Sequence, residues 1–165
     1  MFETVFRALN DRDVRYLVAG GVAVVLHGHM RYTKDLDLVV DLAPEQAMAA
    51  IEVLSASGLV PSVPVDPAMF ADPDARQAWI SEKGMTVLSL HHPDEARLVI
   101  DLFVEHPSDF EALWAGSEEL PLDTTTVRVV SLDDLIAMKR KAARPRDMLD
   151  VEELEQIKLL KEEGL

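Results

Sequence analysis

The sequence contains no cysteine among its 165 residues. Disulfide bonds, thiolate metal sites and a cysteine nucleophile are therefore excluded. A chain without cysteine also fits a reducing compartment, and we expect a cytoplasmic protein.

Long apolar runs are absent as well. A membrane-spanning helix needs about 18 apolar residues, whereas the longest apolar run, 16–26, contains two glycines. The N-terminus has early acids and no basic segment followed by an apolar one, so we expect no signal peptide. The composition, 48% hydrophobic and 28% charged, is ordinary. The length fits one domain over 1–165 that buries a substantial core.

Positive charge is scarce. Sixteen Lys and Arg against thirty Asp and Glu give a net charge of −14, which disfavours broad nonspecific binding to nucleic acid. Five of the sixteen basic residues nevertheless fall within 139–146. This stretch either meets an anionic partner, such as an RNA end, or forms the basic face of a helix that offsets the acids of 152–163.

The spacing of apolar residues predicts an α+β protein with a mixed-sheet core flanked by helices. The core is expected over about 1–130 and a helical part over about 131–165. Residues 61–73 hold four prolines and predict a loop or a short strand. Helices are expected at 2–11, 22–27, 44–57, 75–82, 108–114, from Ser131 to a break at Pro145, and 146–163; strands are expected at 15–19, 35–40, 85–90, 97–104 and 127–130.

Two aspartates lie one residue apart in the expected strand 35–40. Side chains alternate faces along a strand, so Asp35 and Asp37 share one face roughly 7 Å apart. Leu36 and Leu38 then build the core from the other face. Alone, the pair is better explained by a half-exposed edge strand whose acids are solvated than by a metal site.

Asp101 changes that balance, because it interrupts the apolar run 98–104. An ionised carboxylate buried without a partner costs several kcal/mol. If this strand neighbours 35–40, three carboxylates converge on one face, and divalent cations relieve their repulsion most simply. Oxygen ligands suit Mg²⁺ or Mn²⁺. Two such ions about 3.5–4 Å apart can bridge a nucleoside triphosphate and stabilise the leaving pyrophosphate.

The glycine pair Gly20-Gly21 follows an expected strand and begins a helix. Glycine permits close backbone approach, and the first N–H groups of a helix favour phosphate. Alone, such a pair is more often a simple turn; beside three aspartates it predicts a phosphate-binding end of the site.

These motifs together resemble the nucleotidyltransferase superfamily, which shares the fold of DNA polymerase beta. The resemblance rests on Gly20-Gly21, on the R-x-T-x-D-L-D-L segment from Arg31 to Leu38, and on the aspartate within 99–102. The small AbiEii-type branch, associated with toxin–antitoxin and phage-defence systems, looks most similar. Its C-terminal lysine helix resembles 135–139, followed here by an R-P-R-D segment, 144–147, and Asp150.

The resemblance implies a role for each matching residue. Asp35 and Asp37 would be metal ligands, and Asp101 would bind the catalytic metal and help deprotonate the acceptor hydroxyl. The substrate's phosphates would be held by Gly20, Gly21, Arg31, Thr33 and Lys139. Many members carry Gly-Ser, whereas Gly21 offers only its backbone.

The expected activity is transfer of a nucleoside monophosphate from an NTP to a hydroxyl, with pyrophosphate released. The acceptor would be an RNA end, a protein or a small molecule, and a cognate toxin or antitoxin would be a further partner. One alternative is a lincosamide- or aminoglycoside-type transferase, because an acidic surface suits a cationic acceptor. Another is a non-catalytic nucleotide-binding or antitoxin module, which has less need of three clustered carboxylates.

Overall fold

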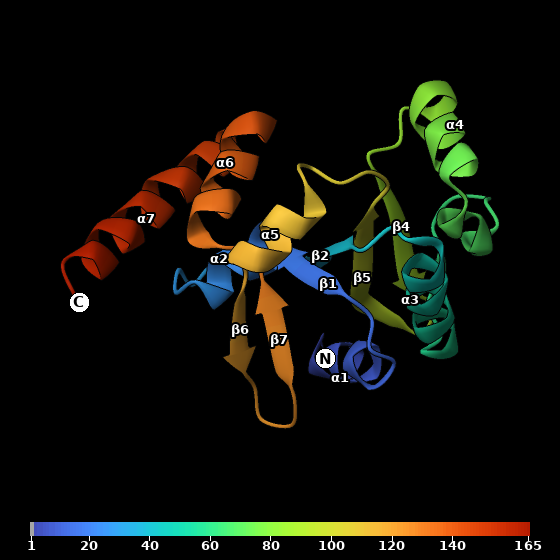
Figure 1. The fold of residues 1–165 in the computed structure, drawn as a ribbon, viewed down its shortest axis with the longest axis horizontal. Helices are drawn as coiled ribbons and strands as arrows, with labels where there is room; N and C mark the ends of the chain where they lie inside the picture. The colour runs from blue at the N-terminus through green and yellow to red at the C-terminus, as the bar shows by residue number, and fades with distance from the viewer. Residues whose placement is uncertain (1) are drawn as a thin grey trace.

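The computed structural model describes residues 2–165, in which seven strands form one mixed sheet flanked by helices (Figure 1). The α-helices are α1 (Phe2–Asp11), α2 (Gly20–Leu26), α3 (Pro44–Ala56), α4 (Pro73–Lys83), α5 (Phe110–Gly116), α6 (Leu132–Ala142) and α7 (Pro145–Glu162), and a 3₁₀ turn, η1, covers Pro67–Ala71. The strands are β1 (Tyr16–Ala19), β2 (Asp35–Val40), β3 (Val60–Pro61), β4 (Val87–His92), β5 (Glu95–Phe103), β6 (Glu118–Pro121) and β7 (Thr126–Val129). The predicted α+β class is confirmed.

The order of the sheet is β3-β4-β5-β2-β1-β7-β6. Its central pair, β2 and β5, is parallel, and β1 pairs with β7 in the same way. The remaining neighbours, including β1 with β2 and β4 with β5, are antiparallel. The chain therefore leaves β2, crosses through α3, η1 and α4, and returns as the β4–β5 hairpin that places β5 beside β2.

The core lies where these central strands meet the helices. Leu36 and Leu38 of β2 and Leu102 of β5 are fully buried. The helix α1 packs against α3 and β7, and α2 packs against β1 and β2. In α1, the helical spacing of Val5, Phe6 and Leu9 produces its buried face.

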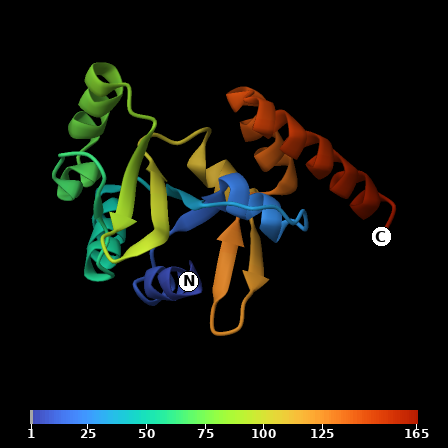
Figure 2. The same cartoon turned by 180° about the vertical axis from the view of Figure 1, so that it is seen from behind.

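The C-terminal helices α6 and α7 pack together at one side of the sheet and are linked to it through α2 (Figures 1 and 2). Ser131 caps α6, its Oγ accepting a hydrogen bond from the Asp134 N–H at 3.0 Å. The first turn of α6 is acidic and its last turn is basic, so the charges at both ends interact favourably with the helix dipole and stabilise the helix. Ala143 ends α6 in a left-handed conformation, and Pro145 begins α7.

Two features of the fold were not predicted. The strand β6 is a short edge strand with the sequence Glu-Glu-Leu-Pro. Its acids and proline are uncommon in strands, so it lacks the alternation of apolar residues that predicts one. The predicted turn 91–94 is shorter than expected, because β4 continues through His92 and only Pro93-Asp94 form the turn. The segment 61–73 contains the end of β3 and η1. Among residues 2–165, no helix is both long and apolar enough to cross a membrane.

Candidate active site

The three aspartates lie on adjacent parallel strands at the centre of the sheet. Asp37 of β2 is the register partner of Asp101 of β5, so the two residues sit side by side. Asp35 lies two residues earlier on β2 and shares their face, because side chains alternate along a strand. The opposite face of β2 carries Leu36 and Leu38, which are fully buried. The expected adjacency of the two strands is confirmed.

Burial and mutual repulsion disfavour the ionised forms of Asp37 and Asp101. The pKa of Asp37 is raised to about 7, first by burial and then by the neighbouring charges of Asp101 and Asp35. Burial is also the main cause that raises the pKa of Asp101, with a smaller contribution from Asp35. Asp35 Oδ1 is buried without a hydrogen-bond partner. For Asp37 and Asp101, burial and repulsion therefore outweigh the stabilising groups that the chain itself supplies.

Ser89 of β4 is a site residue that the sequence did not reveal. It is the register partner of Asp101 in the β4–β5 hairpin, and its Oγ donates a hydrogen bond to Asp101 Oδ1 at 2.6 Å. This hydrogen bond lowers the pKa of Asp101 and so opposes the effect of burial. A lone serine in a strand carries no motif, but the hairpin register would have placed it opposite Asp101.

Close packing explains why Gly20 is a glycine. Its φ is +63°, and a Cβ there would lie 1.9 Å from Asp37 Oδ2. Any side chain would therefore displace the carboxylate as well as strain the backbone.

Gly21 is tightly packed for a different reason. A Cβ at this position would lie 2.5 Å from Thr33 Oγ1 and 2.8 Å from Arg31 Nη2. The second glycine therefore lets the R-x-T segment pack onto the start of α2.

Arg31 connects this segment to α7. Its Nη2 donates to Asp150 Oδ2 at 3.0 Å, and its Nε lies 3.0 Å from Asp150 Oδ1. Its Nη1 donates to the carbonyl of Tyr32, the next residue. The guanidinium thus faces α7 and its own loop, while Thr33 lies against Gly21.

Lys139 is buried in the same ionic network. Its Nζ lies 2.9 Å from Asp150 Oδ2 and 3.3 Å from Asp147 Oδ1. Asp147 also accepts a hydrogen bond from Arg144 Nε at 2.7 Å. With Arg31, the network holds three cations and two anions, and we call these five residues the ionic cluster; Lys139, Asp147 and Asp150 are its buried members. It joins the loop before β2 to α6 and α7.

The ionic cluster is also electrically coupled to the aspartates. The charges of Lys139 and Arg144 both lower the pKa of Asp37, against the larger effects of burial and of its acidic neighbours. The cluster therefore supplies the positive side of the site, and the sheet supplies the negative side.

The rest of the basic stretch 139–146 is largely occupied by α7. Arg140 forms an ion pair with Glu155, and Arg146 donates to the carbonyl of Tyr32. Lys141 alone of the five has neither an ion pair nor a side-chain hydrogen bond within residues 2–165. Of the two interpretations of this stretch, the contacts favour a helix whose basic side chains offset neighbouring acids.

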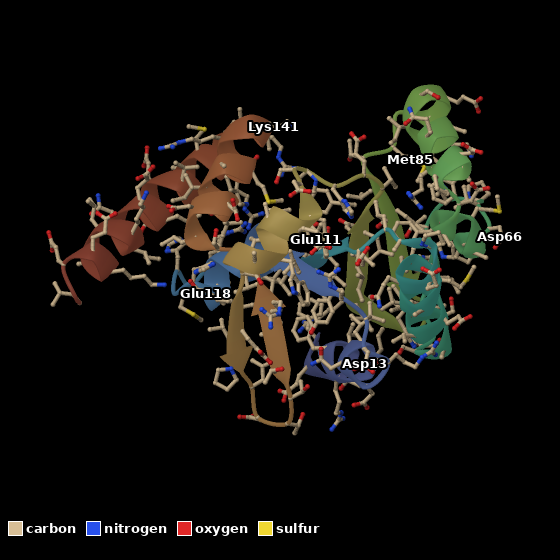
Figure 3. The ribbon with its side chains drawn as sticks, viewed as in Figure 1. Asp13, Asp66, Met85, Glu111, Glu118 and Lys141 are labelled. Atoms are coloured by element: carbon tan, nitrogen blue, oxygen red, sulfur yellow. The ribbon has the colours of Figure 1, made fainter. Side chains whose placement is uncertain are left out.

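A cleft of about 690 Å³ connects the two sides. Four of the predicted site residues line it: Gly20, Asp37, Asp101 and Lys139. The other predicted site residues lie behind or beside that lining; they are Gly21, Arg31, Thr33 and Asp35. Met85 and Lys141 also line the cleft, and Figure 3 shows them on opposite sides, next to β4 and on α6.

A divalent cation fits the aspartates, although they do not form a closed cage. Within residues 2–165, no three His, Asp or Glu side chains are already arranged as a metal site. Mg²⁺ is usually held by one or two carboxylates together with water and substrate phosphates, so a closed cage is not required. The unpaired oxygen of Asp35 and the raised pKa of Asp37 are the features that a cation would satisfy.

The chain was compared with known families and structures. A family model described as "Nucleotidyltransferase of unknown function (DUF6036)" matches residues 2–164. A search of curated proteins gives no match.

Solved structures of similar fold include two antibiotic-modifying enzymes. A lincomycin-bound lincosamide adenylyltransferase, LnuA, has a TM-score of 0.63 at 17% identity, with 94% of this chain and 95% of that chain covered. ANT(2″)-Ia, solved with adenylyl-2″-tobramycin, has a TM-score of 0.58 at 16% identity, with 96% and 91% covered. An antigenic nucleotidyltransferase-like protein from Paracoccidioides brasiliensis has a TM-score of 0.57 at 14% identity, with 95% and 73% covered. At these identities the likeness concerns the fold alone.

The electrostatics of Asp37 predict a dependence of stability on pH in metal-free buffer. The pKa of Asp37 is about 7 in the folded chain against 3.8 ordinarily, so the folded state binds this proton more tightly. The contribution of Asp37 to stability should therefore be fully present below about pH 4 and lost as the pH rises through 7. In EDTA, Asp37→Asn should be more stable than the wild type at pH 8, by about 2–4 kcal/mol.

Urea unfolding of both proteins at pH 5 and pH 8 measures this difference. Asp123→Asn, which changes an exposed aspartate in the β6–β7 turn, is the matched control and should show no such gain. Equal stabilities of Asp37→Asn and the wild type at pH 8 would contradict the assigned environment.

The ionic cluster predicts a large effect from removing Asp150. Asp150→Ala leaves Lys139 and Arg31 buried with one carboxylate fewer, and breaking a buried pair costs about 3–5 kcal/mol. Glu152→Ala, an exposed neighbour on α7, should cost less than about 0.5 kcal/mol. Urea denaturation monitored by circular dichroism tests both, and a loss below about 1 kcal/mol for Asp150→Ala would show that the cluster is not stabilised as described.

Proposed function

The chain belongs to the DUF6036 family of nucleotidyltransferases, and from this premise we propose that it transfers a nucleoside monophosphate from an NTP to a hydroxyl group, releasing pyrophosphate. The observation that carries the proposal is the side-by-side placement of Asp37 and Asp101 in the cleft, with Asp35 next to them. We further propose that the whole chain acts as one nucleotidyltransferase domain.

The three aspartates are the proposed ligands of Mg²⁺ or Mn²⁺, with two ions expected. Such ions would supply charge neutralisation for the triphosphate and for the departing pyrophosphate. The remaining roles fall to the chain's own residues. Asp101 is the proposed base, because Ser89 occupies its Oδ1 and leaves Oδ2 to accept the proton of the acceptor hydroxyl. Its raised pKa supports this role.

The proposed phosphate contacts come from the positive side of the cleft. The ammonium of Lys139 has three donors, of which Asp147 and Asp150 engage two, and Lys139 lines the cleft. The backbone of Gly20 and Gly21 is the second proposed contact.

Arg31 and Thr33 were also expected to contact the phosphates. Their contacts support a different proposal, in which they hold the loop that precedes β2 against Gly21 and Asp150.

A small molecule is the acceptor that the geometry favours. The cleft volume of about 690 Å³ lies within the usual range of small-molecule sites, about 300–1,000 Å³. The basic stretch that was expected to grip an RNA end is mostly paired with acids of α7. Lincomycin and adenylyl-tobramycin are bound by the similar structures, and a hydroxyl-bearing small molecule is our proposal here. An RNA or protein acceptor, the AbiEii-type branch and a toxin–antitoxin partner stay predictions.

Transfer itself is tested with labelled NTPs. The purified protein with Mg²⁺ or Mn²⁺ should release pyrophosphate and label an acceptor from a panel of hydroxylated small molecules, RNA and protein. Asp37→Asn should reduce the rate at least about 1,000-fold, because it removes a proposed ligand of the metal ions that would neutralise the triphosphate, while Asp123→Asn keeps wild-type activity. Equal labelling by Asp37→Asn would refute the assignment of the aspartates.

Metal-dependent NTP binding gives a separate measurement. By calorimetry, the wild type should bind an NTP in Mg²⁺ at least about tenfold more tightly than in EDTA. The double variant with Asp35→Ala and Asp101→Ala should lose that difference. Unchanged affinity of the double variant would rule out the metal model, and Mg²⁺-dependent binding without pyrophosphate release would favour the non-catalytic binding module.

A further inference from the structure

Arg76 is a buried cation that the proposed reaction does not use. It lies on α4, and its exposure is only 8%. Its Nη1 donates to the carbonyl of Phe70, and the guanidinium carbon lies 5.9 Å from the Phe70 ring centroid. Among residues 2–165, no carboxylate forms an ion pair with it. A buried charge without a counter-ion is unfavourable, so this guanidinium is suited to an anion that the chain itself does not provide.

The neighbouring carboxylate does not neutralise Arg76. Asp72 acts on it only through its charge, and burial remains the main cause that lowers the pKa of Arg76. The Asp72 side chain instead caps α4, with Oδ1 accepting from the Asp74 N–H at 2.9 Å.

Arg76 faces a small cavity of about 220 Å³. At a liquid volume of about 30 Å³ for each water, this corresponds to roughly seven waters. It has room for a carboxylate or phosphate group. Gln77 of α4 and Glu105 and His106, which follow β5, line it with Arg76, and apolar side chains complete the walls. A guanidinium carries five N–H donors in a planar fork that matches such oxyanions, and one of its nitrogens is engaged by Phe70.

The cavity adjoins the large cleft. Ile80, Val104, Glu105 and His106 line both. The helix α4 lies on the opposite side of the molecule from α6 and α7 (Figure 1), so this guanidinium is separate from the ionic cluster. A molecule in the cleft can therefore extend an acidic group past these shared walls.

We propose that the Arg76 cavity is a binding site for the carboxylate or phosphate group of a small molecule whose remainder lies in the cleft. The evidence for the anion site is the cavity and Arg76, and it does not depend on the proposed function. The consequence that the acceptor is an acidic compound rests on the proposed function. Glu105 limits the affinity, because its charge on the shared wall repels an anion.

Inorganic phosphate and acetate are the probes, titrated in EDTA without NTP and followed by ¹H–¹⁵N NMR. The wild type should show saturable shifts at 74–80 and 104–106, including the Arg76 Nε–H. Arg76→Gln should weaken this binding at least tenfold. Arg12→Gln is the matched control, because it removes one cation from an exposed pair with Glu52 and should bind as the wild type does.

A second variant decides the question if Arg76→Gln does not fold. Glu105→Gln changes an exposed residue and should bind phosphate at least threefold more tightly than the wild type. Shifts confined to Gly20 and Lys139, no saturable shifts, or unchanged affinity in Glu105→Gln would each overturn the proposal. Phosphate and acetate together distinguish a site for either oxyanion from one selective for phosphate. Because no NTP or metal is present, these outcomes are independent of the transfer assay.

Discussion

Repulsion between carboxylates on adjacent parallel strands is the constraint on which the rest of this structure depends. The pairing of β2 with β5 fixes Asp37 beside Asp101, and their partial burial on that face reduces the screening of their charges by water. A protein gains no stability from such an arrangement in the absence of cations. The neighbouring structure is organised to tolerate it: Ser89 donates to one carboxylate, and Gly20 leaves room for the other. Unfavourable electrostatics of this kind at a cleft are typical of a functional site.

The C-terminal helices place positive charge on the other side of the cleft from these carboxylates. Lys139 is held between Asp147 and Asp150, and Asp150 is shared with Arg31. One buried carboxylate thus ties α6, α7 and the loop before β2 into a single arrangement. The position of the ammonium relative to Asp37 consequently depends on the packing of α7. The helices α6 and α7 therefore contribute to the candidate site, with Lys139 and Asp147 in the lining of the cleft.

The sequence predicted those parts of the candidate site that follow from short-range sequence patterns. Alternation along β2 places Asp35 and Asp37 on one face, and an acid within an apolar run marks Asp101. The partners of these residues depend on register and tertiary packing, which no local pattern contains. Ser89 became visible only through the hairpin register, and β6 was hidden by its acids. Gly21 illustrates an ambiguous signal: the sequence predicts a phosphate contact there, whereas the structure shows that a glycine is needed for Arg31 and Thr33 to pack against it.

The distribution of charge in the cleft bears on how a substrate would lie in it. Cations occur at two places, the ionic cluster around Lys139 at the cleft and Arg76 in the adjoining cavity, and Asp37 and Asp101 line the cleft. Under the proposed function, a triphosphate would lie at the first place, because Lys139 there still has a free donor and the aspartates would share cations with the phosphates. The hydroxyl acceptor would then approach from the side of α4, where apolar walls alternate with Glu105 and His106. A pocket of that kind selects by shape and by one well-placed charge, so we infer that the acceptor would be selected near Arg76, at a distance from the aspartates and the glycine pair.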